Sequence, residues 1–268
     1  MKNQIILLTG ASSGFGKASA EALAERGHIV YGTSRRELPS GKVRMLKLDV
    51  TDRNSCKAAA KQVIDEQGRI DVLINNAGIG IGGAVELATP EEMEKQMGTN
   101  FGGCVNMCNA VLPYMRAARC GKIISFSSIA GVMSIPFQGF YSASKYAIEG
   151  YSLALNMEVH PFGIKVCVIE PGDFATNFTS SRINSQATLE DKDYGPYFKR
   201  ALVEIEKEEN NGCKPSMMAK AVCRIVERRN PKFHNKVGEF LQVSMARCSA
   251  WMPLAWVQRG LRFYYKID

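Results

Sequence analysis

The sequence predicts a single α/β domain in which a doubly wound parallel sheet lies between two layers of helices. Short apolar runs rich in β-branched residues alternate with longer stretches of helical periodicity, which is typical of consecutive βαβ units. Parallel strands joined in this way require right-handed crossovers through the helices. At 268 residues the chain suits one large domain, and no linker, repeat or low-complexity tract divides it.

Each expected strand is a short apolar run, and the strands fall at residues 5–8, 29–33, 43–48, 72–74, 122–126 and 165–170. Helical periodicity places helices between them, at residues 15–26, 52–67, 90–117 and 141–159. Gly27 follows the first helix, and Pro90 opens the third. Thr51 or Asp52 is expected to cap the second helix.

Residues 173–213 interrupt this alternation, because they contain few apolar runs and several Asn, Ser and Asp residues. An open α/β sheet binds its ligand beyond the carboxyl ends of the strands, and this segment follows such an end. We therefore expect a substrate lid here. The alternative is a surface excursion with a short amphipathic helix.

Composition excludes several classes of protein. Apolar residues make up 46% and charged residues 22%, so a disordered chain or a coiled coil is not expected. No apolar run approaches the roughly 18 residues of a spanning helix, and the N-terminal run is too short for a signal peptide. The eight cysteines form no C-x-x-C pair. They indicate free thiols in a cytoplasmic protein and no metal site.

The charge is distributed unevenly. Residues 214–268 hold eleven of the Lys and Arg residues and three of the acids, so the whole net charge of +8 lies there. Trp251 and Trp256 occupy an apolar stretch of this segment, among Arg247, Arg259, Arg262 and Lys266. Aromatic and basic residues together favour a peripheral membrane contact. The alternatives are a helix that covers the substrate cleft or an oligomer interface, whereas nucleic-acid binding is not expected.

A glycine-rich loop follows the first expected strand and opens the first helix. It has the spacing T-G-x-x-x-G-x-G from Thr9 to Gly16, which in this context predicts a Rossmann-like dinucleotide site. Glycine permits a tight turn, and the helix N-terminus favours the negative charge of a pyrophosphate. The residues expected to contact the cofactor here are Gly10, Ser12, Ser13, Gly14, Phe15 and Gly16.

Tyr141 and Lys145 form a second motif. At positions i and i+4 of a helix, the phenol and the ammonium share one face. A nearby cation favours tyrosinate and lowers the phenol pKa from about 10, so Tyr141 is expected to act as a general acid or base.

Together the two motifs resemble those of the classical short-chain dehydrogenase/reductase family. Ser128 lies thirteen residues before Tyr141, which is the family's usual separation. The other matches follow in order over residues 3–180, and they are Asp49-Val50, Asn75-Asn76-Ala77-Gly78, Asn100-Phe101-Gly102-Gly103, and Pro171-Gly172 with Thr176.

The resemblance implies a role for each matching residue. Tyr141 would give a proton to a carbonyl oxygen, Lys145 would lower the Tyr141 pKa and bind the nicotinamide ribose, and Ser128 would hold the carbonyl oxygen. Ser127 is the alternative to Ser128. Asn100 would position a water that links Lys145 to solvent. The remaining matches would contact the cofactor, and they are Asp49, Val50, Asn76, Ala77, Gly78, Pro171, Gly172 and Thr176.

The end of the second strand predicts which cofactor is bound. An NAD-dependent member usually carries an acid there, but this chain has Ser34 followed by Arg35 and Arg36. A guanidinium attracts a 2′-phosphate through charge-assisted hydrogen bonds. We therefore expect Arg35 to bind NADP(H) and reduction to be the favoured direction.

The resemblance is greatest to family members that act on lipophilic alcohols and ketones, namely hydroxysteroid and retinol dehydrogenases and keto-sphingoid reductases. It implies an apolar ketone or alcohol as substrate and a homo-oligomer. The alternatives are a reductase of a small polar or sugar ketone, and a non-catalytic NADP-binding sensor. A sensor would be expected to lack Tyr141 or Lys145, and both are present.

Overall fold

The computed structural model describes residues 3–268 and contains a seven-stranded sheet in the order β3-β2-β1-β4-β6-β7-β9. Every neighbouring pair of strands is parallel, so the predicted α/β class is confirmed. The strands are β1 (Ile5–Leu8), β2 (Ile29–Ser34), β3 (Val43–Lys47), β4 (Val72–Asn75), β6 (Gly121–Phe126), β7 (Ile164–Pro171) and β9 (His234–Val237).

Strand β9 was not predicted from the sequence. It forms the edge of the sheet, where Val168 of β7 pairs with His234. Its residues are HNKV, and none of them is buried. The strand therefore lacks the apolar run by which the six others could be found.

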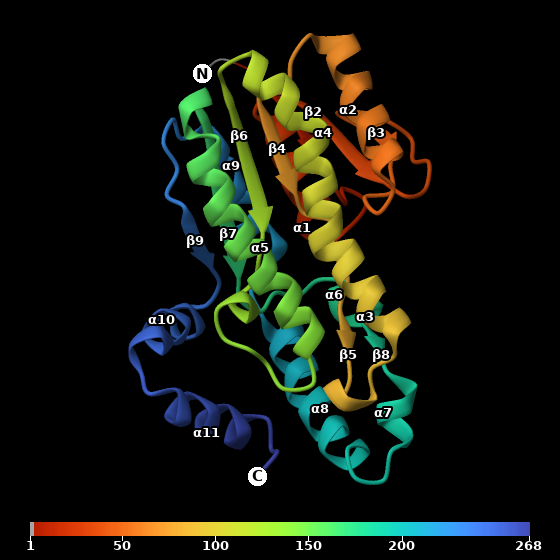
Figure 1. Cartoon of the computed structure of the whole chain (residues 1–268), viewed down its shortest axis with the longest axis vertical. Helices are drawn as coiled ribbons and strands as arrows, with labels where there is room; N and C mark the ends of the chain where they lie inside the picture. The colour runs from red at the N-terminus through yellow and green to blue at the C-terminus, as the bar shows by residue number, and fades with distance from the viewer. Residues whose placement is uncertain (1–2) are drawn as a thin grey trace.

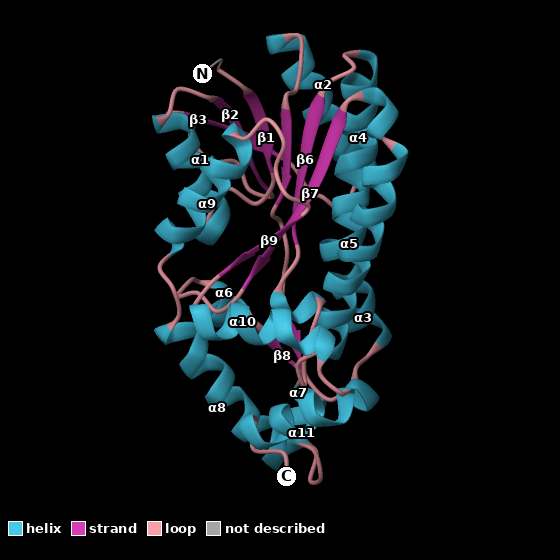
Figure 2. Ribbon diagram, turned by 90° about the vertical axis from the view of Figure 1, so that its left-hand side faces the viewer, coloured by secondary structure: helices cyan, strands magenta, loops and turns pink. Residues whose placement is uncertain are grey.

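Helices cover both faces of the sheet (Figure 2). On one face lie α1 (Gly14–Glu25) and α9 (Pro215–Glu227), where Leu23 and Val222 belong to the same buried cluster as Leu8. On the other lie α2 (Arg53–Gln67), α4 (Gly103–Ala117) and α5 (Gly139–Glu158), where Val63 and Val111 belong to the same buried cluster as Leu7. The doubly wound arrangement is thus confirmed, and Asp52 is the residue that caps α2.

The helix expected at residues 90–117 has a wider turn in its middle. It consists of α3 (Pro90–Met97), a π-turn (Gly98–Gly102) and α4. A capping box between Thr89 and Glu92 begins α3. The π-turn carries the buried Asn100, and such turns occur frequently at functional sites.

The segment expected to be a lid lies beyond the carboxyl ends of the strands (Figure 1). It contains α6 (Phe178–Ser181), β8 (Ile183–Asn184), α7 (Gln186–Glu190) and α8 (Gly195–Asn211). Strand β8 pairs with β5 (Ile81–Gly82), and a buried ion pair joins Arg182 to Glu209. The alternative to a lid included an amphipathic helix, and α8 is such a helix because it buries Phe198 and Ile205. Movement of this segment stays a prediction.

The C-terminal segment has two parts. Residues 214–237 contain α9 and β9 and belong to the sheet and its helical layer, and they carry seven of the segment's eleven basic residues. Only the rest is a tail, which contains α10 (Phe240–Cys248), a 3-10 turn (Ser249–Trp251) and α11 (Leu254–Tyr264). The basic segment expected over 214–268 therefore spans two structural parts, and most of its basic residues lie in the first. None of the helices in residues 3–268 is long and apolar enough to cross a bilayer.

Short 3-10 turns complete the connections of the fold. They lie at Val85–Leu87, Ile129–Gly131 and His160–Phe162. The second of these directly follows β6 and is capped by Ser128, so it positions a predicted catalytic residue.

Candidate active site

A cleft of about 1000 Å³ opens at the carboxyl ends of the central strands. The order of the sheet reverses between β1 and β4, and ligands of open α/β sheets bind at such a point. Two predicted site residues, Gly16 and Asn100, do not line the cleft. All the others do, and they are Gly10, Ser12, Ser13, Gly14, Phe15, Arg35, Asp49, Val50, Asn76, Ala77, Gly78, Ser128, Tyr141, Lys145, Pro171, Gly172 and Thr176.

The glycine-rich loop has the geometry that a pyrophosphate requires. Gly10 and Gly14 have φ angles of +70° and +52°, a region that side chains disfavour. A Cβ atom on Gly16 would lie 2.1 Å from the carbonyl oxygen of Gly10, so the helix can approach the loop only without a side chain. Asn76 fixes the loop because its Nδ2 donates to the carbonyls of Thr9 (2.8 Å) and Gly10 (3.1 Å). Gly16 therefore acts through packing, and the loop fits a dinucleotide at the N-terminus of α1.

Tyr141 and Lys145 lie on α5 and face the end of β6. The Lys145 ammonium donates to the carbonyl of Phe126 (2.9 Å) and lies 5.6 Å from the centre of the Tyr141 ring. Burial lowers the pKa of Lys145 to about 8. The i, i+4 motif thus brings the two groups together in the cleft.

The expected lowering of the Tyr141 pKa is wrong for this structure. Burial raises the pKa of Tyr141 to about 12, and the neighbouring Ser128 hydroxyl opposes the rise. Desolvation of the phenolate outweighs the Ser128 hydrogen bond and the attraction of Arg182, which both lower the pKa. The phenol consequently holds its proton at neutral pH, as a proton donor must.

Geometry separates the two serines that follow β6. The Ser128 hydroxyl is the one beside Tyr141, and its Oγ accepts from the backbone N–H of Ala130 (3.0 Å). The Ser127 hydroxyl instead donates to the carbonyl of Lys145 (3.4 Å), inside the packing of α5. The structure therefore favours Ser128 as the hydroxyl that faces a substrate.

Asn100 lies outside the cleft and forms hydrogen bonds to Ile79, which lines it, and to Ser144. Its Nδ2 donates to the carbonyl of Ile79 (3.1 Å) and to the Ser144 hydroxyl (3.0 Å), and its Oδ1 accepts from the N–H of Ile79 (2.8 Å). Both amide protons are thus used within the protein. The water-positioning role of Asn100 stays a prediction.

Comparisons with known proteins agree with these features. A family model described as short chain dehydrogenase matches residues 4–187. The chain belongs to the short-chain dehydrogenase family. This confirms the family that the motifs resembled, and it makes the chain an oxidoreductase that binds a nicotinamide cofactor.

Individual members of the short-chain dehydrogenase family are similar along nearly the whole chain. A 3-ketodihydrosphingosine reductase from Bacteroides thetaiotaomicron is 60% identical over 268 residues, which is 100% of both chains. The structure of a short-chain dehydrogenase from Streptomyces avermitilis is 31% identical, with a TM-score of 0.78, and covers 97% of this chain and 98% of its own. A family structure from Burkholderia phymatum in complex with NAD is 21% identical, with a TM-score of 0.80 and coverage of 93% and 94%, and supports the fold alone.

In this short-chain dehydrogenase, a basic group lies at the expected adenosine end of the cleft. Arg35 and Arg36 follow β2 and line the cleft, and Ser34 accepts from the backbone N–H of Arg36 (3.2 Å). Asp49 accepts from the N–H (2.9 Å) and the hydroxyl (2.7 Å) of Thr51, and these bonds lower its pKa. Asp49 is thereby held as a carboxylate in a fixed orientation.

The opposite end of the cleft contains residues that the sequence did not predict. Apolar side chains line it at Ile135, Phe178, Ile183 and Ile205, and acids line it at Asp173, Glu208 and Glu209. Most of them belong to the lid segment, and Tyr265 joins them from the C-terminal tail. No local motif marks such residues, because only the tertiary fold brings them together.

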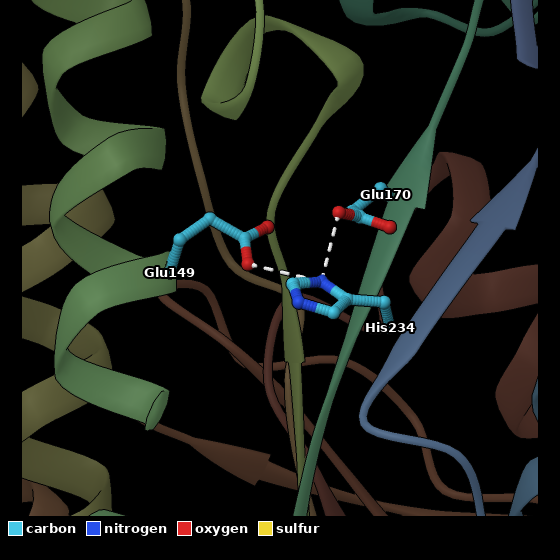
Figure 3. A group of neighbouring side chains, drawn as sticks. All are labelled: Glu149, Glu170 and His234. Carbon is cyan, nitrogen blue, oxygen red and sulfur yellow. Dashed lines mark hydrogen bonds and ion pairs between the residues drawn. The ribbon is translucent and has the colours of Figure 1, made fainter. Parts of the chain in front are cut away.

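A charged cluster lies one helical turn from Lys145 (Figure 3). His234 Nδ1 is 3.1 Å from Glu170 and 3.6 Å from Glu149, and both carboxylates are buried. These three side chains could surround a metal ion, but the Lys236 ammonium already contacts both Glu170 oxygens, at 2.9 and 3.0 Å. We therefore interpret the cluster as an ion-pair network. The carboxylate of Glu149 raises the pKa of Lys145 and so opposes the effect of burial.

Proposed function

We propose that this short-chain dehydrogenase is an NADP(H)-dependent reductase of a long-chain amino ketone of the 3-ketodihydrosphingosine class, and that the product is a secondary alcohol. The observation that carries the proposal is the 60% identity, over 100% of both chains, with a 3-ketodihydrosphingosine reductase. The proton donor and the apolar lining of the cleft support it.

The protonated phenol of Tyr141 donates its proton to the ketone oxygen as negative charge develops there. The Ser128 hydroxyl, beside it, holds the same oxygen by a hydrogen bond. The bound nicotinamide supplies the hydride. Lys145 stabilises the tyrosinate that remains and binds the nicotinamide ribose, and its own position is fixed by the carbonyl of Phe126.

The basic end of the cleft supports NADP(H) as the cofactor. Arg35 and Arg36 can each donate charge-assisted hydrogen bonds to a 2′-phosphate, and Ser34 stands where an acid would repel it. Asp49, the nearest carboxylate of the cleft on this side, is already occupied by Thr51.

The substrate end supports an amino ketone with a long alkyl chain. Ile135, Phe178 and Ile205 offer apolar contacts to the chain. Asp173 and Glu208 supply negative charge for the protonated amine, which lies on the carbon next to the ketone. Burial raises the pKa of Asp173 to about 6, so this carboxyl is ionised at neutral pH; one of its oxygens accepts from Gln242, and the other can accept from the amine.

The test is a substrate panel with the purified full chain. Oxidation of NADPH and of NADH is followed with 3-ketodihydrosphingosine, with a ketone of equal length that lacks the amine, and with a short water-soluble ketone. We expect the highest kcat/KM for NADPH with the amino ketone, and mass spectrometry should identify the alcohol. Equal kcat/KM for the ketone without the amine would contradict the role of the acids. Turnover confined to sugars or other polar ketones would contradict the substrate class.

A further inference from the structure

We propose that α10, the turn after it and α11 form a docking surface for an anionic lipid bilayer, which sets the substrate end of the cleft against the membrane. We call this surface the tail face. Its six most exposed large apolar side chains are Phe240, Leu241, Trp251, Leu254, Trp256 and Phe263. Only one part of this proposal, the route by which the substrate enters the cleft, rests on the proposed function.

The tail face is unusually apolar for a surface in contact with water. Each of the six side chains is between 68% and 90% exposed, and all lie within 24 consecutive positions of the chain. Scattered exposed apolar residues are normal, whereas six of them on two consecutive helices and the turn between them indicate an interaction site. Figure 1 shows α10 and α11 at the end of the molecule where the lid segment also lies.

The charge of the tail favours an anionic partner over a neutral or basic one, and its aromatic rings favour lipid. From Phe240 to Tyr264 the chain has three arginines and no acid. Arg247 and Arg259 are exposed and make no ion pair with the described residues, whereas Arg262 pairs with Asp268 (2.9 Å). Aromatic rings at headgroup level with cations beside them are the composition of an interfacial helix. The apolar side chains, rather than the net charge of the whole chain, therefore carry most of the expected binding.

The two sides of α11 differ in burial. Trp256 and Phe263 are seven positions apart and share one side of the helix, with Arg259 next to them. Val257 and Leu261 lie on another side and are half-buried against the protein. A helix with one side toward the protein and an apolar, basic side toward solvent can lie flat on a bilayer without leaving the fold.

The tail is attached to the wall of the cleft at two points. Gln242 of α10 accepts from the backbone N–H of Asp173 (3.0 Å) and donates to its carboxylate. After α11, Tyr265 lines the cleft and Lys266 pairs with Glu204 of α8. Docking of the tail face would therefore bring the apolar end of the cleft to the bilayer, so that a lipid ketone need not cross water.

The first test uses the intrinsic fluorescence of the chain. Its two tryptophans, Trp251 and Trp256, both lie in the tail face, so emission reports on this surface alone. Vesicles of phosphatidylcholine with phosphatidylglycerol should shift the emission of the full chain to the blue, and brominated acyl chains should quench it. Pure phosphatidylcholine should require at least tenfold more lipid for the same shift. Unchanged emission with both vesicle types would overturn the proposal.

The second test uses variants at exposed positions. The double variant Trp256→Ser/Phe263→Ser should lower the fraction that co-sediments with anionic vesicles at least tenfold. Met157→Ser, a matched change at a 71% exposed position of α5, should leave it unchanged. Arg247→Gln/Arg259→Gln should remove most of the dependence on anionic lipid and on salt. If instead the serine double variant lowers the solution mass without lipid, the tail face joins two copies of the chain, and the proposal is wrong.

Turnover separates this proposal from the proposed function. The serine double variant should lose activity on 3-ketodihydrosphingosine presented in vesicles and keep it on a short water-soluble ketone. Vesicle binding by a chain that reduces no long-chain ketone would overturn the substrate assignment and leave docking established. Equal activity of variant and wild type on the vesicle-borne ketone would overturn the route of entry.

Discussion

A substitution at Gly16 tests how the glycine-rich loop and α1 fit together. In Gly16→Ala the new Cβ would lie 2.1 Å from the Gly10 oxygen and 2.5 Å from Asn76 Nδ2, so the backbone of the loop must shift. Overpacking of this kind costs about 1–3 kcal/mol. Loss of an Asn76 hydrogen bond adds about 0.5–1.5 kcal/mol. The higher helix propensity of alanine offsets up to about 1 kcal/mol of this loss in the free energy of unfolding.

The net loss in the free energy of unfolding is therefore about 0.5–4.5 kcal/mol, which for a chain of this size lowers Tm by roughly 1–18 °C. The same shift misaligns the backbone N–H groups that face the pyrophosphate, so we expect Kd for NADPH to rise at least tenfold. Thermal unfolding followed by circular dichroism and a fluorescence titration with NADPH measure the two effects.

Gly150→Ala is the matched control. Gly150 also lies in a helix, but a Cβ there would meet no atom within 4 Å. This variant should melt at or slightly above the wild-type temperature and bind NADPH normally. The reasoning would be refuted by a Gly16→Ala protein that is as stable as the control and binds NADPH with wild-type affinity.

Three further substitutions test the proposed chemistry. Tyr141→Phe removes the proton donor but keeps the ring, so kcat should fall by roughly 10²–10⁴-fold while NADPH still binds. A near-normal kcat would show that Tyr141 is not the proton donor. Arg35→Ala should weaken the binding of NADPH by about 1.5–3 kcal/mol, which raises its Kd by one to two decades, and should weaken the binding of NADH far less. Equal losses of affinity for both cofactors would show that Arg35 does not bind the 2′-phosphate. Because the pKa of Lys145 is about 8, kcat/KM for reduction should fall as pH rises above that value and the ammonium loses its proton. Glu149→Gln removes a charge that raises the Lys145 pKa, so the fall in kcat/KM should begin at lower pH. An unchanged pH profile would contradict the influence of Glu149 on Lys145.

The structure brings together the residues of those motifs whose members lie close together in the sequence. The loop from Gly10 to Gly16 and the pair of Tyr141 and Lys145 are local, so backbone geometry alone places their members near one another. Five of the six predicted strands were found for the same reason, since each buries a nearly continuous run of side chains, whereas β3 buries none of its residues. The right-handed crossover rule then gives the hand of each connection, whereas the order of the strands comes from the structure.

Features set by long-range contacts could not be predicted in this way. The acids and apolar residues at the substrate end, such as Asp173 and Ile205, come from the lid segment and meet only in the folded chain. The pKa of Tyr141 depends on how deeply the phenol is buried, which the i, i+4 spacing does not reveal. Strand β9 is polar because it is an edge, and its partner lies 66 positions earlier, where Val168 pairs with His234.

The π-turn between α3 and α4 has a consequence for the length of the chain. Gln96, before the turn, holds the backbone of Ile79 and Ile81, at 2.8 and 2.7 Å, while Met107 and Val111, after it, are buried against the sheet. The turn already accommodates one residue more than an α-turn, because its hydrogen bonds span five residues rather than four. One further residue inserted there would rotate the two halves of the helix by about 100° relative to each other. Either Gln96 or the apolar side of α4 would then face away from its partners. This stretch should accept exchanges of side chain more readily than a further insertion.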